Sequence, residues 1–135
     1  RNNERLTVKN IIAVRPVMSM AQVIAVLGQP VHVDASFNGR FEYRCNPQII
    51  RADSAWSFTY TERGSVILPY PMLWVNFNER KRVRDVYVKR YWLLDDPPLY
   101  SIEESPCDTL DPIVPPGQWE VVQATTALMI YFPIN

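Results

Sequence analysis

The stretch VRPVMSMAQVIAVLGQP, residues 14–30, decides the fold. Pro16 lacks an N–H group and restricts the residue before it, so it ends whatever precedes it. Ser19 is a suitable N-cap, and apolar residues follow at helical spacing: Met20, Val23, Ile24 and Leu27. Gly28 suits a left-handed C-cap, and Pro30 prevents continuation. The pattern predicts a short amphipathic helix over residues 19–27.

The residues before this stretch predict a second short helix. Residues 1–6 are polar and are expected to fray. Thr7 can cap a helix over residues 7–14 with Val8, Ile11 and Ile12 on one side. A turn over residues 15–18 then joins two helices into a hairpin. Helices this short need a packing partner for their apolar face.

After Pro30 the apolar period changes from helical to alternating. Residues 31–39 contain turn formers and predict a loop. Alternation predicts strands over residues 40–45, 55–61, 72–79 and 82–94, whereas residues 46–53 and 64–71 interrupt it. Parity assigns these side chains to the buried face: Phe41, Tyr43, Trp56 and Phe58. We expect an antiparallel sheet of three or four strands, covered on one side by the helical hairpin.

The composition shifts after residue 94. Residues 95–118 are rich in proline and acids and predict an extended, mostly irregular arm. Residues 119–133 have the β-branched and aromatic content of one or two more strands, with an amphipathic helix over 119–130 as the alternative. The predicted architecture is therefore a two-layer α+β core over residues 1–94, with residues 95–135 packed on the same domain.

The overall composition limits the classes of partner. The chain has 135 residues, and 14 basic residues balance 14 acidic ones. Such neutrality argues against nucleic acid, which demands a basic surface. The sequence contains no apolar run long enough to span a bilayer. Because it starts abruptly at Arg1, we expect a trimmed chain from which an export signal or lipid anchor has been lost.

Two cysteines, Cys45 and Cys107, lie far apart and outside any CxxC motif. They are either two reduced core thiols or one disulfide in an oxidising compartment. In the chain-entropy model, a disulfide closing so long a loop would stabilise the fold by about 4 kcal/mol. Together with one histidine they fall short of the four ligands of a structural zinc site.

The sequence offers little for catalysis. His32 is the single histidine, and a loop position in water explains it better than a general base paired with Asp34. The acidic pairs 95–96 and 103–104 fall on the irregular arm. With four glycines, the chain also lacks a phosphate-binding loop. We expect neither an enzyme nor a cofactor, metal or small-molecule substrate.

Two groups of residues are candidates for partner binding. Arg80, Lys81 and Arg82, with Arg84 nearby, suit anionic lipid headgroups or an acidic protein patch. The alternative is a solvated hairpin tip, balanced by Glu79 and Asp85. The second group contains the aromatic residues expected on the face away from the helices, which either bind a partner or receive the C-terminal segment: Trp74, Tyr87 and Tyr91.

The order of these elements resembles the SmpA/OmlA (BamE-like) family of bacterial envelope lipoproteins. The family pattern is matched by Met18-Ser19, Val23, Leu27-Gly28 and Pro30, and then by the strand motifs at Trp56–Phe58 and Leu73–Phe77. Val17 stands where the family has glycine. The resemblance covers residues 5–93 and implies a helical hairpin packed on an antiparallel sheet, in a non-catalytic binding module or scaffold.

Two functions remain open from the sequence. The first is a periplasmic subunit of an outer-membrane or secretion assembly, anchored by an N-terminal lipid and binding another envelope protein. The second is a periplasmic or secreted inhibitor or immunity protein that blocks an enzyme. The same helix-on-sheet unit serves several functions, so the fold alone does not decide between them.

Overall fold

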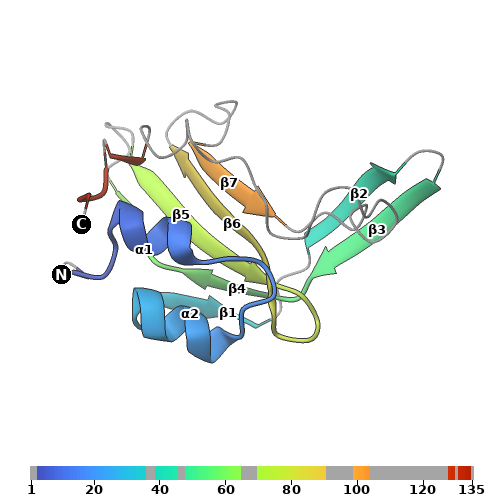
Figure 1. Cartoon of the computed structure of the whole chain (residues 1–135), viewed down its shortest axis with the longest axis horizontal. Coiled ribbons are helices and arrows are strands. Elements are labelled where there is room, and N and C mark those ends of the chain that lie inside the picture. The colour runs from blue at the N-terminus through green and yellow to red at the C-terminus, as the bar shows by residue number, and fades with distance from the viewer. Residues whose placement is uncertain are drawn as a thin grey trace.

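The computed structural model describes residues 3–35, 39–45, 48–64, 70–90, 99–103, 128–129 and 131–134. Within these residues the chain forms two helices and seven strands (Figure 1). The strands form a five-stranded sheet and a separate two-stranded one. The predicted α+β class is therefore confirmed.

The two helices begin and end where local capping requires. Helix α1 (Val8–Ala13) starts at Thr7, whose hydroxyl accepts the Asn10 N–H at 3.1 Å. Helix α2 (Met20–Leu27) starts with a reciprocal capping box between Ser19 and Gln22. It ends at Gly28, whose φ of 81° places it in the left-handed region. The predicted ends of both helices are confirmed to within one residue.

Residues 3–5 are not frayed, contrary to expectation. The Asn3 side chain donates to the Leu27 carbonyl at 2.8 Å, and the Arg5 guanidinium donates to the Ala25 carbonyl at 3.1 Å. Both groups therefore satisfy carbonyls that helix α2 leaves open at its C-terminus. The cation of Arg5 also opposes the negative end of the helix dipole.

The large sheet has the strand order β1-β4-β5-β6-β7, and every neighbouring pair is antiparallel. Its strands are β1 (His32–Asp34), β4 (Trp56–Thr59), β5 (Pro71–Phe77), β6 (Val83–Arg90) and β7 (Tyr100–Glu103). Three of them, β4, β5 and β6, follow the predicted alternation. The prediction of three or four strands was too low, because both edge strands were missed.

The edge strands arise from segments predicted to be irregular. Strand β1 lies inside residues 31–39, predicted as a loop, and pairs with β4. Strand β7 lies inside residues 95–118, predicted as an irregular arm, and pairs with β6. They contain only three and four residues, which is too short for a clear alternating pattern.

The strand predicted at residues 40–45 forms, but it does not join the large sheet. Strand β2 (Gly39–Cys45) pairs with β3 (Gln48–Ser54) in a hairpin that Figure 1 shows projecting away from the large sheet. Residues 46–53, read as a break, thus contain most of its partner strand. The assignment of Phe41 and Tyr43 to the buried face of the large sheet was therefore wrong.

One apolar cluster forms the core. Its sheet residues alternate along the strands, and buried residues of both helices belong to the same cluster. The fully buried members include Ile11, Val23, Leu27, Leu73, Val75, Phe77, Val86 and Val88. Phe58 and Phe77 meet edge to face, with ring centroids 4.6 Å apart.

The far end of the chain also reaches this core. Leu128 and Phe132 are buried in it, and the Pro133 carbonyl accepts the Val8 N–H at 2.8 Å. Phe132 donates its N–H to the Leu128 carbonyl at 2.9 Å, so the chain makes a helical turn here. The strand expected over residues 119–133 does not extend to these residues. The rest of that prediction lies outside the described residues.

Candidate functional site

The turn between β5 and β6 carries the three predicted cations. Asn78 organises it, because its side-chain oxygen accepts the N–H groups of Arg80 at 2.9 Å and Arg82 at 3.1 Å. Lys81 adopts a left-handed φ of 61° and donates its N–H to the Asn78 carbonyl. The backbone of the turn is therefore fixed by its own hydrogen bonds, which sets where the three cationic residues begin.

The cations of this turn face solvent. Arg80, Lys81 and Arg82 are all exposed, and none has an ion-pair partner among the described residues. The Lys81 ammonium lies 5.5 Å from the ring centre of the half-buried Trp56. That distance is within the range of a cation–π contact. The carboxylate of Glu79 is also exposed, so the turn presents three positive charges and one negative charge.

The turn between the two helices lies against the start of β6. The Val17 N–H donates to the Val83 carbonyl and the Val83 N–H donates to the Met18 carbonyl, both at 2.8 Å. The backbones of Ser19 and Arg82 form an isolated antiparallel β-bridge. Strand β7 pairs with β6 only from Asp85 onward, so residues 17–19 take the neighbouring place at the start of β6.

Val17 has an unfavourable backbone conformation. Met18 donates its N–H to the Arg15 carbonyl, and Val17 at the third position has a φ of 67°. With Pro16 at the second position, this is a type II turn, which prefers glycine at the third position. A β-branched residue there is strained. We call the surface formed by Val17, Trp56, Arg80, Lys81 and Arg82 the hairpin-tip surface.

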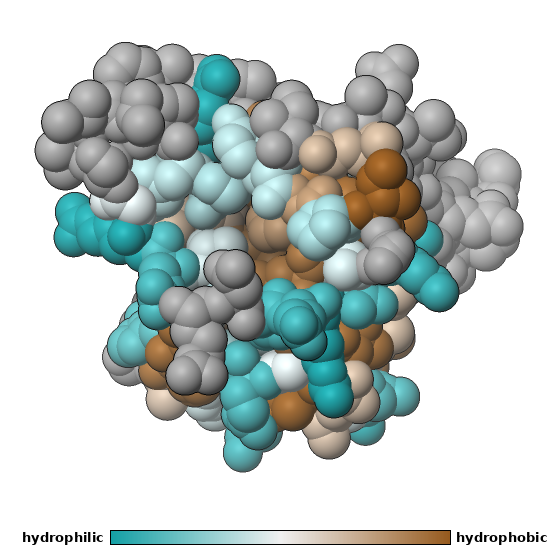
Figure 2. All heavy atoms as spheres, turned by 90° about the vertical axis from the view of Figure 1, so that its left-hand side faces the viewer, coloured by the Kyte–Doolittle hydropathy of each residue, from teal (hydrophilic) through white to brown (hydrophobic). Residues whose placement is uncertain are grey.

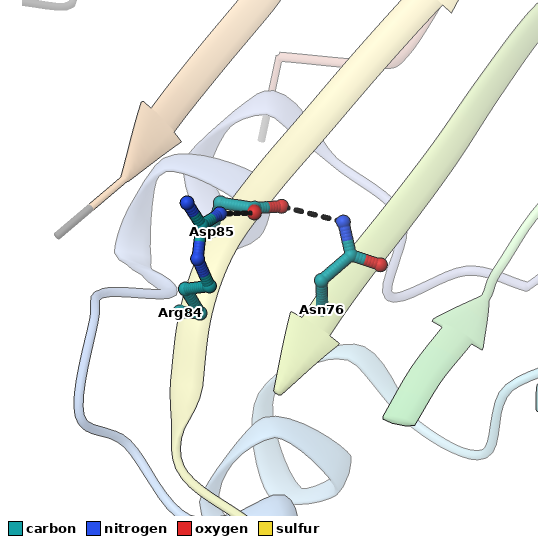
Figure 3. A network of polar contacts seen from close by, with 3 residues as sticks. All are labelled: Asn76, Arg84 and Asp85. Carbon is teal, nitrogen blue, oxygen red and sulfur yellow. Dashed lines mark hydrogen bonds and ion pairs between the residues drawn. The ribbon is translucent and has the colours of Figure 1, made fainter. Parts of the chain in front are cut away.

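Arg84 does not belong to this surface, although the sequence grouped it with the other cations. The register shifts after Asn76, so Asn76 pairs with Asp85 and Phe77 pairs with Val83. Arg84 is the extra residue of this β-bulge, which re-aims its side chain. It forms a buried ion pair with Asp85, whose other oxygen accepts the Asn76 amide at 2.6 Å (Figure 3).

This network changes the description of the sheet face away from the helices. That face was expected to be wet, but Ser57, Asn76, Arg84 and Asp85 are all buried, with exposed fractions from 3 to 9%. Asp85 was expected to balance the exposed cations at the tip. It is instead committed to Arg84 and Asn76. A sheet covered on one side only was thus the wrong expectation at this end of β5 and β6.

The aromatic candidates Trp74 and Tyr87 lie on this same face as a cross-strand pair. They are directly opposite in register, with ring centroids 5.8 Å apart, and both are half-buried. The Asn76–Asp85 pair lies between them and the hairpin tip along the strands. The structure therefore brings these two aromatics together but separates them from the cations. Tyr91, the third candidate, lies outside the described residues.

A groove lies beside the N-terminal segment. Figure 2 faces this side of the molecule, where apolar surface is visible among hydrophilic side chains. The residues that line the groove include Arg5, Gly28, Val31, Tyr60, Thr61 and Phe132. Burial raises the pKa of Tyr60 well above its usual value, and its hydroxyl donates to the Gly28 carbonyl at 2.8 Å. The phenol thus holds the end of helix α2 in place.

Tyr100 and Arg15 also have buried polar atoms, but these differ from the Tyr60 hydroxyl in their hydrogen bonding. The Tyr100 hydroxyl and one terminal nitrogen of Arg15 are buried without a hydrogen-bond partner. Burial raises the pKa of Tyr100 to about 12, while the positive charge of Arg15 acts in the opposite direction. The charge of Arg15 therefore acts on the buried Tyr100 hydroxyl, and nothing in the sequence indicated this pair.

The remaining predicted site residues are distributed as follows. The side chain of Cys45 and all of Cys107 lie outside the described residues, so their pairing stays open. His32 is exposed in β1 rather than in a loop. Among the described residues, no group of three or more acidic, histidine or cysteine side chains could hold a metal ion. No described helix is both long and apolar enough to cross a membrane.

Comparisons with protein-family models, with curated proteins and with solved structures found no match. The resemblance to the SmpA/OmlA family therefore rests on the sequence motifs quoted above and stays a prediction.

Proposed function

We propose that the chain is a non-catalytic protein-binding module that recognises an acidic surface of its partner through the hairpin-tip surface. In this proposal it is a scaffold subunit of a bacterial envelope assembly, and its helical hairpin seals one face of the sheet as in the BamE-like fold. The location is the periplasm, with an N-terminal lipid holding the protein at the outer membrane. Family and location are inferred from the sequence resemblance.

The observation that carries the proposal is the set of three exposed cations on a turn that is internally fixed. A turn whose backbone is held in one arrangement loses less conformational freedom on binding than a flexible loop does. The cations have no ion-pair partner among the described residues, so they remain available to a carboxylate-rich surface. Charges of this kind steer association and contribute to specificity.

The strained backbone of Val17 also supports the hairpin-tip surface as the binding site. An unfavourable backbone conformation persists only where the surrounding structure enforces it, and such residues gather at functional positions. Val17 is enforced by its hydrogen bond to Val83 and has an exposed fraction of 57%. It therefore places an apolar side chain in solvent near the cations. An apolar group within a charged rim is the common anatomy of a protein interface.

The test combines capture with charge reversal. A photo-crosslinking residue at Lys81 is used to capture partners in the native envelope, with the same residue at exposed Arg63 as the control position. The captured partner is then titrated with the wild-type chain and with the R80E/K81E/R82E variant. Three exposed charges contribute about 1–3 kcal/mol, so the variant should bind about tenfold more weakly or worse.

A matched variant, K9E/R63E, reverses two exposed cations elsewhere and should bind as the wild type does. Equal loss in both variants would indicate a nonspecific effect of net charge and would contradict the proposal. Vesicles of anionic phospholipid form a separate arm, because binding to them alone would replace the protein partner with lipid headgroups. Capture of a single soluble enzyme, inhibited by the chain, would favour the inhibitor function.

A further inference from the structure

Strand β1 forms one edge of the large sheet, whereas the cations of the hairpin-tip surface lie on the turn between two other strands, β5 and β6. Among the described residues its one strand neighbour is β4. The segment that contains it reads VHVDA over residues 31–35. Val31 and Val33 have exposed fractions of 53% and 50%, and His32 and Ala35 are also exposed. An exposed apolar edge strand is a template for pairing with another strand.

The hydrogen-bond pattern shows which backbone groups of β1 face outward. Tyr60 donates its N–H to the Leu73 carbonyl, so the backbone of Tyr60 is turned toward β5. Because these directions alternate along a strand, Thr59 and Ser57 are turned toward β1. Their register partners His32 and Asp34 face back to β4. The N–H and C=O groups of Val33 between them therefore point away from the sheet.

This geometry makes β1 complementary to itself. We infer that two copies of the chain pair antiparallel along β1, with a twofold axis at Val33. The Val33 residues of the two copies would exchange N–H···O=C bonds. In that register His32 of each copy faces Asp34 of the other. The Val31 N–H already donates to the Thr59 carbonyl at 2.9 Å, so the pairing is confined to residues 32–34. The proposal does not rest on the function proposed above, because it uses the outer edge of β1 and none of the residues of the hairpin-tip surface.

The side-chain pairs match on both faces of this pairing. Val33 pairs with Phe58 in register and lies on the core face of the sheet, so the apolar Val33–Val33 pair extends that face. On the other face, His32 and Asp34 of the two copies form a non-hydrogen-bonded pair. Cα atoms in such pairs are about 4.5 Å apart, close enough for imidazole and carboxylate to meet. The symmetry produces this contact twice.

A contact of three residues in each copy is small. Standard interfaces bury about 800 Å² on each partner, and smaller ones are weak or transient. We therefore expect a reversible dimer with a dissociation constant of roughly micromolar or weaker. The favoured occupant is a second copy because each polar residue meets its opposite. A strand of another protein would not in general place an acidic residue opposite His32 and a histidine opposite Asp34.

Sedimentation velocity of the full chain over a wide concentration range tests the inference. The wild type should pass from monomer to dimer as its concentration rises. Val33→Lys keeps the backbone donor but places two ammonium groups at the symmetry axis, so it should stay monomeric at every concentration. Ile49→Thr, which removes another exposed apolar side chain in β3, should dimerise as the wild type does.

The charge swap provides the decisive comparison. His32→Asp places two carboxylates opposite each other and should weaken dimerisation at least about tenfold. Adding Asp34→His restores complementary pairs and should return the dimer. Circular dichroism identifies any variant that fails to fold. If Val33→Lys fails to fold, the comparison of His32→Asp with the double variant decides the inference. A wild type that stays monomeric, a dimer that survives Val33→Lys, or a swap without recovery would each overturn the inference.

Discussion

The left-handed conformation of Val17 predicts that glycine at this position is more stable than alanine. At ordinary positions the order of stability is the opposite. The position has a φ of 67° in a turn whose preceding residue is proline. At ordinary positions glycine is less stable than alanine by about 0.5–1 kcal/mol, because it loses more backbone freedom on folding. At Val17 a side chain itself costs about 1–2 kcal/mol, because its Cβ crowds the carbonyl oxygen.

The difference between the two effects sets the magnitude. V17G should be more stable than V17A by about 0.5–1 kcal/mol. The loss of the valine side chain is nearly common to both variants, since 57% of the residue is exposed. Urea unfolding, followed by circular dichroism, measures the two free energies, and a shift of about 2–5 °C in Tm should accompany the difference.

An exposed helical position supplies the control. Ala25 lies in α2, and Ala25→Gly should lose about 1 kcal/mol, which is the normal order. If V17A proves as stable as V17G or more stable, Val17 is not held in the left-handed region. The type II turn, and the use of its strain in the functional argument, would then be wrong.

Three further substitutions test other parts of the fold. Ser19→Ala removes the capping box of α2 and should lower the free energy of unfolding by about 1 kcal/mol, measured by urea titration. Asp85→Ala leaves the buried Arg84 without this counter-ion and should cost about 3 kcal/mol, while an equal loss from an exposed Glu79→Ala control would contradict the burial argument. Tyr100→Phe removes a buried hydroxyl without a partner and should raise stability at pH 7 by about 1 kcal/mol. Because the folded-state pKa of Tyr100 is raised from 10 to about 12, its contribution is complete below pH 10 and is lost as pH rises toward 12. Unfolding titrations between pH 9 and 12 should therefore show a shallower alkaline loss for Tyr100→Phe than for the wild type.

Local sequence patterns predicted the helices well because the controlling interactions are local. Ser19 and Gln22 cap within one turn, and Gly28 ends the helix through its own backbone. The strands at β4, β5 and β6 were also found, because apolar residues recur at every second position through much of each segment. In these segments one short window of sequence contains the physical cause of the structure.

The strand pairing was predicted less well because alternation gives a period but no partner. Strand β2 alternates as clearly as β5, yet it pairs with β3 in a separate hairpin. The Asn46-Pro47 dipeptide, a common turn former, was the available indication of that hairpin. Strand β7 was missed because only pairing with β6 distinguishes its four residues from an extended segment.

The candidate site was predicted only in part, for a similar reason. The cations of residues 80–82 were recognised from composition, and the structure places them at an exposed hairpin tip. Arg84 was misassigned because a β-bulge breaks the two-residue period, and nothing in a single sequence announced the bulge. Val17 did have an indication, since it follows proline at a position where the resembling family has glycine.

The hydrogen bond from Val8 to the Pro133 carbonyl has a consequence for the order of folding. During synthesis, helix α1 and the hairpin of β5 and β6 emerge well before residues 128–133. Since Leu128 and Phe132 are part of the one core cluster, that core stays incomplete until the ribosome has added them. Partly made chains would present apolar surface to chaperones, and a chain truncated before residue 128 would stay in that state.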